Sequence, residues 1–195
     1  MIDCFVSMAA RDSRRLFGYG RGHARRYFYK TGGRLEILQE EPADADGNMG
    51  TEIERKFTVV GDTWRPSARS VQIVQGYMTR DPQRVVRIRT MDNRGAIALK
   101  GISRGAARTE FEYEIPAADA RQLLNEMCFK PLIDKTRYYV PHGGMVWEID
   151  EFRAPRPGLI LAEIEIPSVD FVFERPDWVG EEVTGNAAFY NQNMT

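Results

Sequence analysis

The chain has 195 residues, of which 43% are hydrophobic and 28% are charged, and its formal net charge is -1. This composition is ordinary for a soluble domain with a sizeable core, and it excludes a strong overall bias toward nucleic acid or a membrane surface. No apolar run approaches the roughly 18 residues that a membrane-spanning helix needs. We therefore expect no membrane or nucleic acid partner, and either a monomer or a homodimer.

The cysteine content points to a reducing compartment. Cys4 and Cys128 lie far apart and outside any spacing that is typical of a zinc site. This pattern argues against a disulfide framework. We expect a cytoplasmic location.

Residues 1–48 differ in composition from the rest of the chain. Up to Arg34 they hold eight basic and two acidic residues, and they end in an Ala/Asp/Gly-rich run at 42–48. The arginines and aromatics of residues 14–27 could contact nucleic acid or another anionic surface. A disordered extension without a function of its own is the favoured interpretation. We predict a disordered extension over 1–48 and one domain over 49–195.

Eight short extended segments are predicted after this extension, at residues 52–60, 71–79, 85–91, 95–101, 108–115, 133–140, 145–152 and 159–166. Turn residues separate most of them, and such short connections favour antiparallel pairing. Residues 116–127 predict a helix, because a proline and an acidic residue precede apolar residues at helical spacing. A second short helix is expected at 177–182 or beginning near Asn186.

Each predicted strand has one charged and one apolar face, because side chains alternate along a strand. In the first strand Glu52, Glu54 and Lys56 share one face, opposite Ile53 and Phe57. Such strands could close with the apolar faces inside, or with the charges inside and the apolar faces covered by helices. The density of Glu, Asp and Arg favours the second arrangement, in which a polyanion and divalent cations would explain the charged interior. Arginine suits phosphate, and carboxylates without His or Cys suit Mg²⁺ or Mn²⁺.

The sequence resembles the triphosphate tunnel metalloenzymes, or CYTH superfamily, and is closest in pattern to short bacterial inorganic triphosphatases. The hallmark Glu-x-Glu-x-Lys is matched by Glu52, Glu54 and Lys56. Further matching stretches follow in order at residues 87–89, 98–101, 108–115, 134–138, 147–152, 162–166 and 180–184. The resemblance implies a mainly β fold, an eight-stranded antiparallel closed β-barrel that forms a charged tunnel, with peripheral helices.

The resemblance also implies roles for individual residues. The metal ligands would be Glu52, Glu54 and Glu165, with Glu163, Asp150 and Glu110 as candidates for a second metal or for the attacking water. The triphosphate would be held by Lys56, Arg87, Arg89, Lys100, Arg108, Lys135 and Arg137. Lys56, Lys135 and Glu110 would be the catalytic residues. Glu112, Glu114 and Glu148 could instead form structural ion pairs.

The function implied is Mg²⁺- or Mn²⁺-dependent hydrolysis of a triphosphate, with inorganic tripolyphosphate as the leading substrate. A class IV adenylyl cyclase or a thiamine triphosphatase on the same fold is the alternative. A non-catalytic module that binds polyphosphate or a nucleotide is an alternative of another class. Relatives usually continue beyond the position of Asn191 with a basic helical tail, so we expect one tunnel mouth to be more open here.

Overall fold

A computed structural model of the chain describes residues 51–195 with their side chains, except that of Ser67, and residues 16–21, 24–31 and 34–42 as backbone only. The larger sheet contains β4 (Thr51–Val59), β5 (Arg69–Tyr77), β6 (Val85–Met91), β7 (Arg94–Lys100), β8 (Ala107–Ile115), β9 (Ile133–His142), β10 (Met145–Ala154), β11 (Ile160–Glu165) and β12 (Val179–Glu182). One α-helix, α1 (Ala117–Glu126), lies between β8 and β9 in this part of the chain. The eight predicted strands and the predicted helix are therefore present, with shifted ends.

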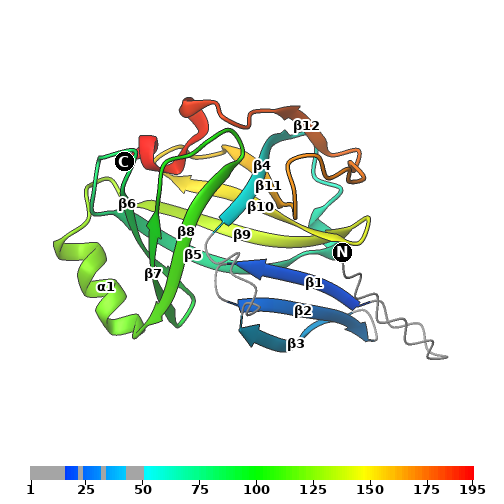
Figure 1. Ribbon diagram of the computed structural model, residues 1–195, viewed down its shortest axis with the longest axis horizontal. Helices are drawn as coiled ribbons and strands as arrows, with labels where there is room; N and C mark the ends of the chain where they lie inside the picture. Colours follow the sequence, from blue (N-terminus) through cyan, green and yellow to red (C-terminus); the bar gives the residue numbers. More distant parts are fainter. Residues whose placement is uncertain (1–15, 22–23, 32–33, 43–50) are drawn as a thin grey trace.

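The strands β4 to β11 close into an antiparallel barrel (Figure 1). The order around it is β11, β10, β9, β5, β6, β7, β8 and β4, and the pairing of β4 with β11 completes the ring. Closure satisfies the backbone groups that would otherwise lie on open sheet edges. The prediction of an eight-stranded closed barrel is confirmed.

β12 is a short additional strand. One of the two positions predicted for a second helix was 177–182, and that prediction was wrong because β12 occupies it. β8 pairs with β4 only from Thr51 to Ile53, so the same edge of β4 is open further along. The carbonyl of Lys56 on that edge accepts a hydrogen bond from the amide of Val183 at 2.8 Å, just after β12. An extended segment can donate such hydrogen bonds to a strand edge. A helix cannot, because its backbone amides donate to carbonyl groups within the helix.

The second helix position, near Asn186, holds two short 3₁₀ turns. They are η2 (Ala187–Phe189) and η3 (Asn191–Met194). The side chain of Asn186 accepts a hydrogen bond from the amide of Ala188 at 3.1 Å, which satisfies one of the free donors at the start of η2.

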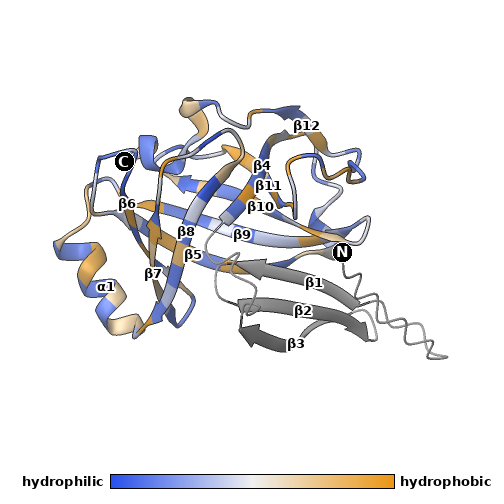
Figure 2. Cartoon of the chain, in the orientation of Figure 1, coloured by the Kyte–Doolittle hydropathy of each residue, from blue (hydrophilic) through white to orange (hydrophobic). Residues whose placement is uncertain are grey.

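The charged faces of the strands point into the barrel. Residues paired directly across neighbouring strands share a face, and the pairs include Lys56 with Glu163 and Arg137 with Asp150. Asp150 is fully buried although it is charged. Figure 2 shows the resulting mixture of hydrophilic and hydrophobic positions along single strands. The arrangement with charges inside is the one the structure adopts.

Two apolar layers cover the outer faces of the strands. In the first, α1 packs Ala120 and Leu124 against Ile88 of β6. Gly95 of β7 permits this close approach, because a Cβ atom there would lie 2.7 Å from the Cβ of Ala120. In the described part of the chain α1 has only 10 residues, too few for a helix that crosses a membrane.

The second outer layer is the larger one, and loops rather than helices cover it. Its centre consists of Phe57, Trp147 and Ile149, which are all fully buried. Trp178 and Phe173, from the segment before β12, pack on this centre. The rings of Trp147 and Trp178 are arranged edge to face, with 5.4 Å between their centroids. Covering by helices, which we expected, therefore holds only for the layer under α1.

The division into a disordered extension over 1–48 and one domain over 49–195 stays a prediction. Three strands are described within the first of these ranges. These are β1 (Leu16–Arg21), β2 (Ala24–Thr31) and β3 (Arg34–Pro42), which form a separate antiparallel sheet. The first segment contains Phe17 and Tyr19, and the second contains the consecutive residues Tyr27, Phe28 and Tyr29. Aromatic residues are favourable in strands. The remaining residues up to 48, and all side-chain contacts of the arginine-rich run, lie outside the described part.

Candidate active site

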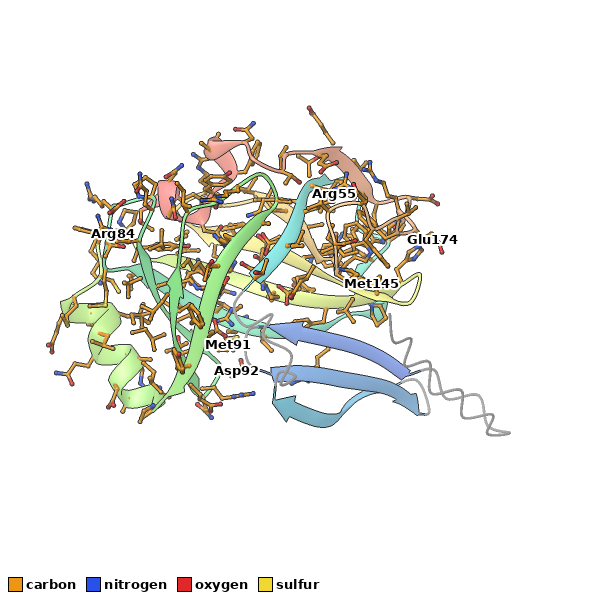
Figure 3. All side chains as sticks on the ribbon, viewed as in Figure 1. Arg55, Arg84, Met91, Asp92, Met145 and Glu174 are labelled. Atoms are coloured by element: carbon orange, nitrogen blue, oxygen red, sulfur yellow. The ribbon has the colours of Figure 1, made fainter. Side chains whose placement is uncertain are left out.

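The barrel encloses a cavity of about 290 Å³ that opens at one end of the strands. Five of the seven residues expected to hold a triphosphate line it: Lys56, Arg87, Lys100, Arg108 and Arg137. The other two, Arg89 and Lys135, are buried in the same interior but do not line the cavity. Figure 3 draws the side chains of the described part on the ribbon, inside and outside the barrel. The barrel thus brings together cations from five different strands.

One half of the interior is an ion-pair network around Glu110 and Glu52. Arg87 lies 3.1 Å from Glu110, and Lys100 also forms an ion pair with Glu110. Arg108 donates to Glu52 at 2.8 Å, and Lys100 lies 3.5 Å from the same carboxylate. Burial of these charges is tolerated because each has a partner of opposite sign.

The other half of the interior is organised around Arg137. Its guanidinium donates to Asp150 at 2.7 Å and to Glu163 at 2.8 Å, and it also pairs with Glu148. Lys135 pairs with Asp150, and Lys56 lies 2.7 Å from Glu163. One arginine is therefore shared by three buried carboxylates.

The three acids for which structural ion pairs were the alternative, Glu112, Glu114 and Glu148, all pair with arginines. Glu112 accepts from Arg87 at 2.9 Å and from Arg89 at 2.5 Å. Glu148 pairs with Arg137, and Glu114 pairs with Arg94 at 2.7 Å in an exposed position. Glu112 and Glu148 thus belong to the charged interior, whereas Glu114 lies at its rim.

Glu54 lies between the two halves and has the most unusual electrostatic position. Burial, together with the nearby charges of Glu163 and Glu52, raises the pKa of its carboxyl group to about 7. Lys56 and Arg108 oppose this rise. A carboxyl group that holds its proton near neutrality among other carboxylates would lose that proton readily to a bound cation.

The lysines of the interior divide into two kinds. Burial lowers the pKa of Lys100 to about 8, with the charge of Arg87 as the next cause. Burial also lowers the pKa of Lys135 to about 8, against the opposing charge of Asp150. For Lys56 burial acts in the same direction, but the charges of Glu163, Glu54 and Asp150 and the hydrogen bond to Glu163 together outweigh it, and the pKa rises. Lys56 is therefore the most firmly charged lysine of the three.

The carboxylates near Lys56 are held ionised. Burial would raise the pKa of Glu163, but Lys56 and Arg137 lower it well below its usual value. Arg137 and Lys135 likewise lower the pKa of Asp150 against the effect of burial. Both acids were predicted as metal ligands, and here both are engaged by cationic side chains.

The donor set for a divalent cation fits best on β4 and β11. Glu54 lies opposite Glu165 across these two strands, and Glu52 precedes Glu54 by two residues on the same face of β4. Within residues 51–195 no three acidic, His or Cys side chains converge closely enough to enclose a metal as they stand. The carboxylate chemistry and the raised pKa of Glu54 nevertheless suit a hard cation.

Sequence reasoning missed residues that come from the ends of the barrel. Thr184, Tyr190, Asn191 and Gln192 line the cavity mouth from the segment after β12, and Tyr77 lines it from β5. Their positions depend on which segment folds over the barrel end, and no local pattern reports that. Only the charged half of the lining could be recognised by alternation.

Comparisons with known proteins place this geometry in context. The CYTH domain matches residues 50–191 of the chain. An inorganic triphosphatase of Acetivibrio thermocellus is 44% identical over 146 residues, which cover 75% of this chain and 94% of that protein. An inorganic triphosphatase of Nitrosomonas europaea is 31% identical over 158 residues, which cover 74% of this chain and 96% of that protein.

A solved structure supports the same relationship. The crystal structure of an inorganic triphosphatase is similar to this chain with a TM-score of 0.53 and 29% sequence identity. The matched region covers 73% of this chain and 96% of that structure.

Proposed function

Since the chain belongs to the CYTH domain family, we propose that it is a metal-dependent hydrolase of inorganic tripolyphosphate. The observation that carries this proposal is the small cavity, open at one end of the barrel, that is lined by five cationic side chains from the strands. A cavity of about 290 Å³ lies near the lower limit of small-molecule sites, which suits a compact polyanion. The relatives named inorganic triphosphatase support the same substrate.

The charge balance of the interior supports a need for metal. Seven cationic side chains face it: Lys56, Arg87, Arg89, Lys100, Arg108, Lys135 and Arg137. Eight acidic side chains share the same face: Glu52, Glu54, Glu110, Glu112, Glu148, Asp150, Glu163 and Glu165. A triphosphate would therefore bring several negative charges into an interior that is not positive by itself. Divalent cations would compensate them.

Glu52, Glu54 and Glu165 would hold the metal. Mg²⁺ or Mn²⁺ supplies charge neutralisation on the phosphate oxygens when bound. Glu163 and Asp150 are secondary candidates, because a phosphate that takes over Lys56 or Arg137 would release these carboxylates from their present ion pairs.

The cationic side chains would bind the substrate and stabilise the transition state. Lys56, Arg87, Lys100, Arg108 and Arg137 would bind phosphate oxygens, and Arg89 and Lys135 would support them from behind. Water attacks the terminal phosphorus in line, a new P–O bond forms, and the bridging P–O bond breaks to release phosphate and pyrophosphate.

Of the three residues predicted to be catalytic, Lys56 lines the cavity, whereas Lys135 and Glu110 are buried next to it. Lys56 would stabilise charge on the phosphate oxygens directly, and Lys135 would add to the positive potential from behind. Glu110, which now holds Arg87 and Lys100, would orient the attacking water or accept its proton.

The test is phosphate release from tripolyphosphate, ATP, thiamine triphosphate and pyrophosphate, with Mg²⁺, with Mn²⁺ and with a chelator. We expect tripolyphosphate to be the preferred substrate and the chelator to abolish turnover. Cyclic AMP as the main product from ATP would replace this proposal with an adenylyl cyclase. Tight binding of tripolyphosphate without turnover under every metal condition would replace it with a non-catalytic binding module.

A further inference from the structure

The segment of residues 183–195, here called the closing segment, lies over the open end of the barrel. It begins with the hydrogen bond from Val183 to Lys56 and is held again by Arg156, which donates to the carbonyl of Ala188 at 3.0 Å. Met194 is 7% exposed and packs in an apolar cluster that includes Phe152. These anchors fix the residues between them against the cavity mouth.

Asn191 of the closing segment is a polar residue of the cavity wall whose hydrogen-bonding capacity is not used. Its side-chain oxygen is buried and has no hydrogen-bond partner among the described residues. The two other asparagines of the segment differ in this respect. Asn193 donates to the carbonyl of Ala187 at 2.7 Å, and Asn186 accepts from the amide of Ala188. Asn193 and Asn186 hold the segment together, whereas Asn191 does not.

A buried amide oxygen without a donor is unfavourable, so no hydrogen bond among the described residues holds this amide in its present orientation when a ligand binds. Lys56, Lys100 and Arg108 line the same cavity as Asn191, so an anion bound by these cations would lie in the space that the amide adjoins. A side-chain amide can present either its oxygen or its NH₂ group by a half turn. The NH₂ group is the one that suits a phosphate oxygen.

We propose that Asn191 is a specificity-determining residue that donates a hydrogen bond to the outermost phosphate of bound tripolyphosphate. This inference rests on the proposed function. Because Asn191 lies at the mouth, it would meet the end of the substrate that points outward. In tripolyphosphate that end is a free phosphate with several charged oxygens. In a nucleoside triphosphate it is a phosphate ester that carries a sugar, so the amide has fewer oxygens to bind and less room beside it.

The experiment compares the wild-type protein with Asn191→Ala and Asn191→Asp in kinetics with tripolyphosphate and ATP. We expect Asn191→Ala to lower kcat/KM for tripolyphosphate on the order of tenfold, as for a lost hydrogen bond to a charged group. The value for ATP should change less than about threefold, since little of this bond is made there. Asn191→Asp, which has nearly the same shape, should lower tripolyphosphate affinity further because its charge repels phosphate.

Asn193→Ala is the matched control, because Asn193 is close in sequence and holds the segment without lining the cavity. It should leave the ratio of the two kcat/KM values unchanged. An equal loss for both substrates in Asn191→Ala, or the same change of ratio in Asn193→Ala, would overturn the inference in favour of a packing role. If either alanine variant unfolds, the affinity of Asn191→Asp for tripolyphosphate is measured by calorimetry instead. An affinity equal to that of the wild type overturns the inference.

The two proposals fail in distinguishable ways. Wild-type protein that releases no phosphate from tripolyphosphate overturns the proposed function, and the role of Asn191 with it. Wild-type protein that hydrolyses tripolyphosphate, with Asn191→Ala equal to it on both substrates, overturns the role of Asn191 alone.

Discussion

The two faces of β4 are both buried, yet they are stabilised in opposite ways. Glu54 and Lys56 point into the barrel among other charges, while Phe57 points outward into a layer of aromatic side chains. On the outer face, apolar burial stabilises the fold directly. On the inner face, paired charges roughly offset the cost of their own desolvation. The outer layers therefore hold the barrel together, whereas the charged interior adds little net stability.

The largest effect is expected where one inner charge serves several partners. Arg137→Met would leave Asp150, Glu148 and Glu163 without their shared cation. The free energy of unfolding should fall by about 3–5 kcal/mol, as for a broken buried ion pair. Urea denaturation measures this loss. Arg153→Met is the control, because Arg153 pairs with Asp134 in an exposed position, and a similar loss there would contradict the distinction.

The next largest effect is a gain in the free energy of unfolding, and it is expected in Glu54→Gln. Glu54 has a folded-state pKa of about 7, above its usual value of 4.5, so the unfolded state releases its proton first as the pH rises. Stability is therefore lost between pH 4.5 and about 7, by roughly 3 kcal/mol in total. Glu54→Gln should remove this loss when metal is chelated, so its gain over the wild type grows across that window.

The same variant separates stability from activity. With Mg²⁺ present, Glu54→Gln should lose turnover by about a hundredfold or more, because a proposed metal ligand is removed. Thermal melting with and without Mg²⁺ is the second readout, since the wild type alone should gain stability from the ion. Unchanged metal affinity in Glu54→Gln would contradict the assignment of Glu54 to the metal.

A smaller effect is expected in the outer layer. Ile149 is fully buried there and is followed in β10 by the inward-facing Asp150. Ile149→Val should lower the free energy of unfolding by about 0.5–1.5 kcal/mol, because it removes one buried methyl group. The value of kcat/KM should stay unchanged when it is measured per folded molecule. A large change in KM would show that the two faces are not independent.

The smallest effect concerns a pair at the edge of the outer face. Arg55 on β4 donates to Glu182 on β12 at 2.7 Å, and Figure 3 labels Arg55. Both side chains are partly exposed. Glu182→Gln should therefore change the free energy of unfolding by only about 0–1 kcal/mol in chemical denaturation. If Glu182→Gln lowered the free energy of unfolding as much as Arg137→Met, partly exposed and buried ion pairs would contribute equally, and the distinction between them would be wrong.

The sequence alone determined the two faces of each strand and the identity of the inner charges. Alternation at period two places Glu52, Glu54 and Lys56 together whatever the neighbouring strands are, because strand geometry is local. The density of acids and arginines then favoured the closed barrel with its charges inside. The roles of these residues toward metal and phosphate remain predictions.

Only the tertiary structure decided what each charge meets and what covers the barrel. Arg137 gathers acids from β10 and β11, and β12 fills the edge of β4 from more than a hundred residues away. The loop cover over Trp147 and the position of Asn191 at the mouth depend on the same long-range pairing. Local propensity carries no information about partners so distant in the chain, because closing such loops is decided by the whole fold.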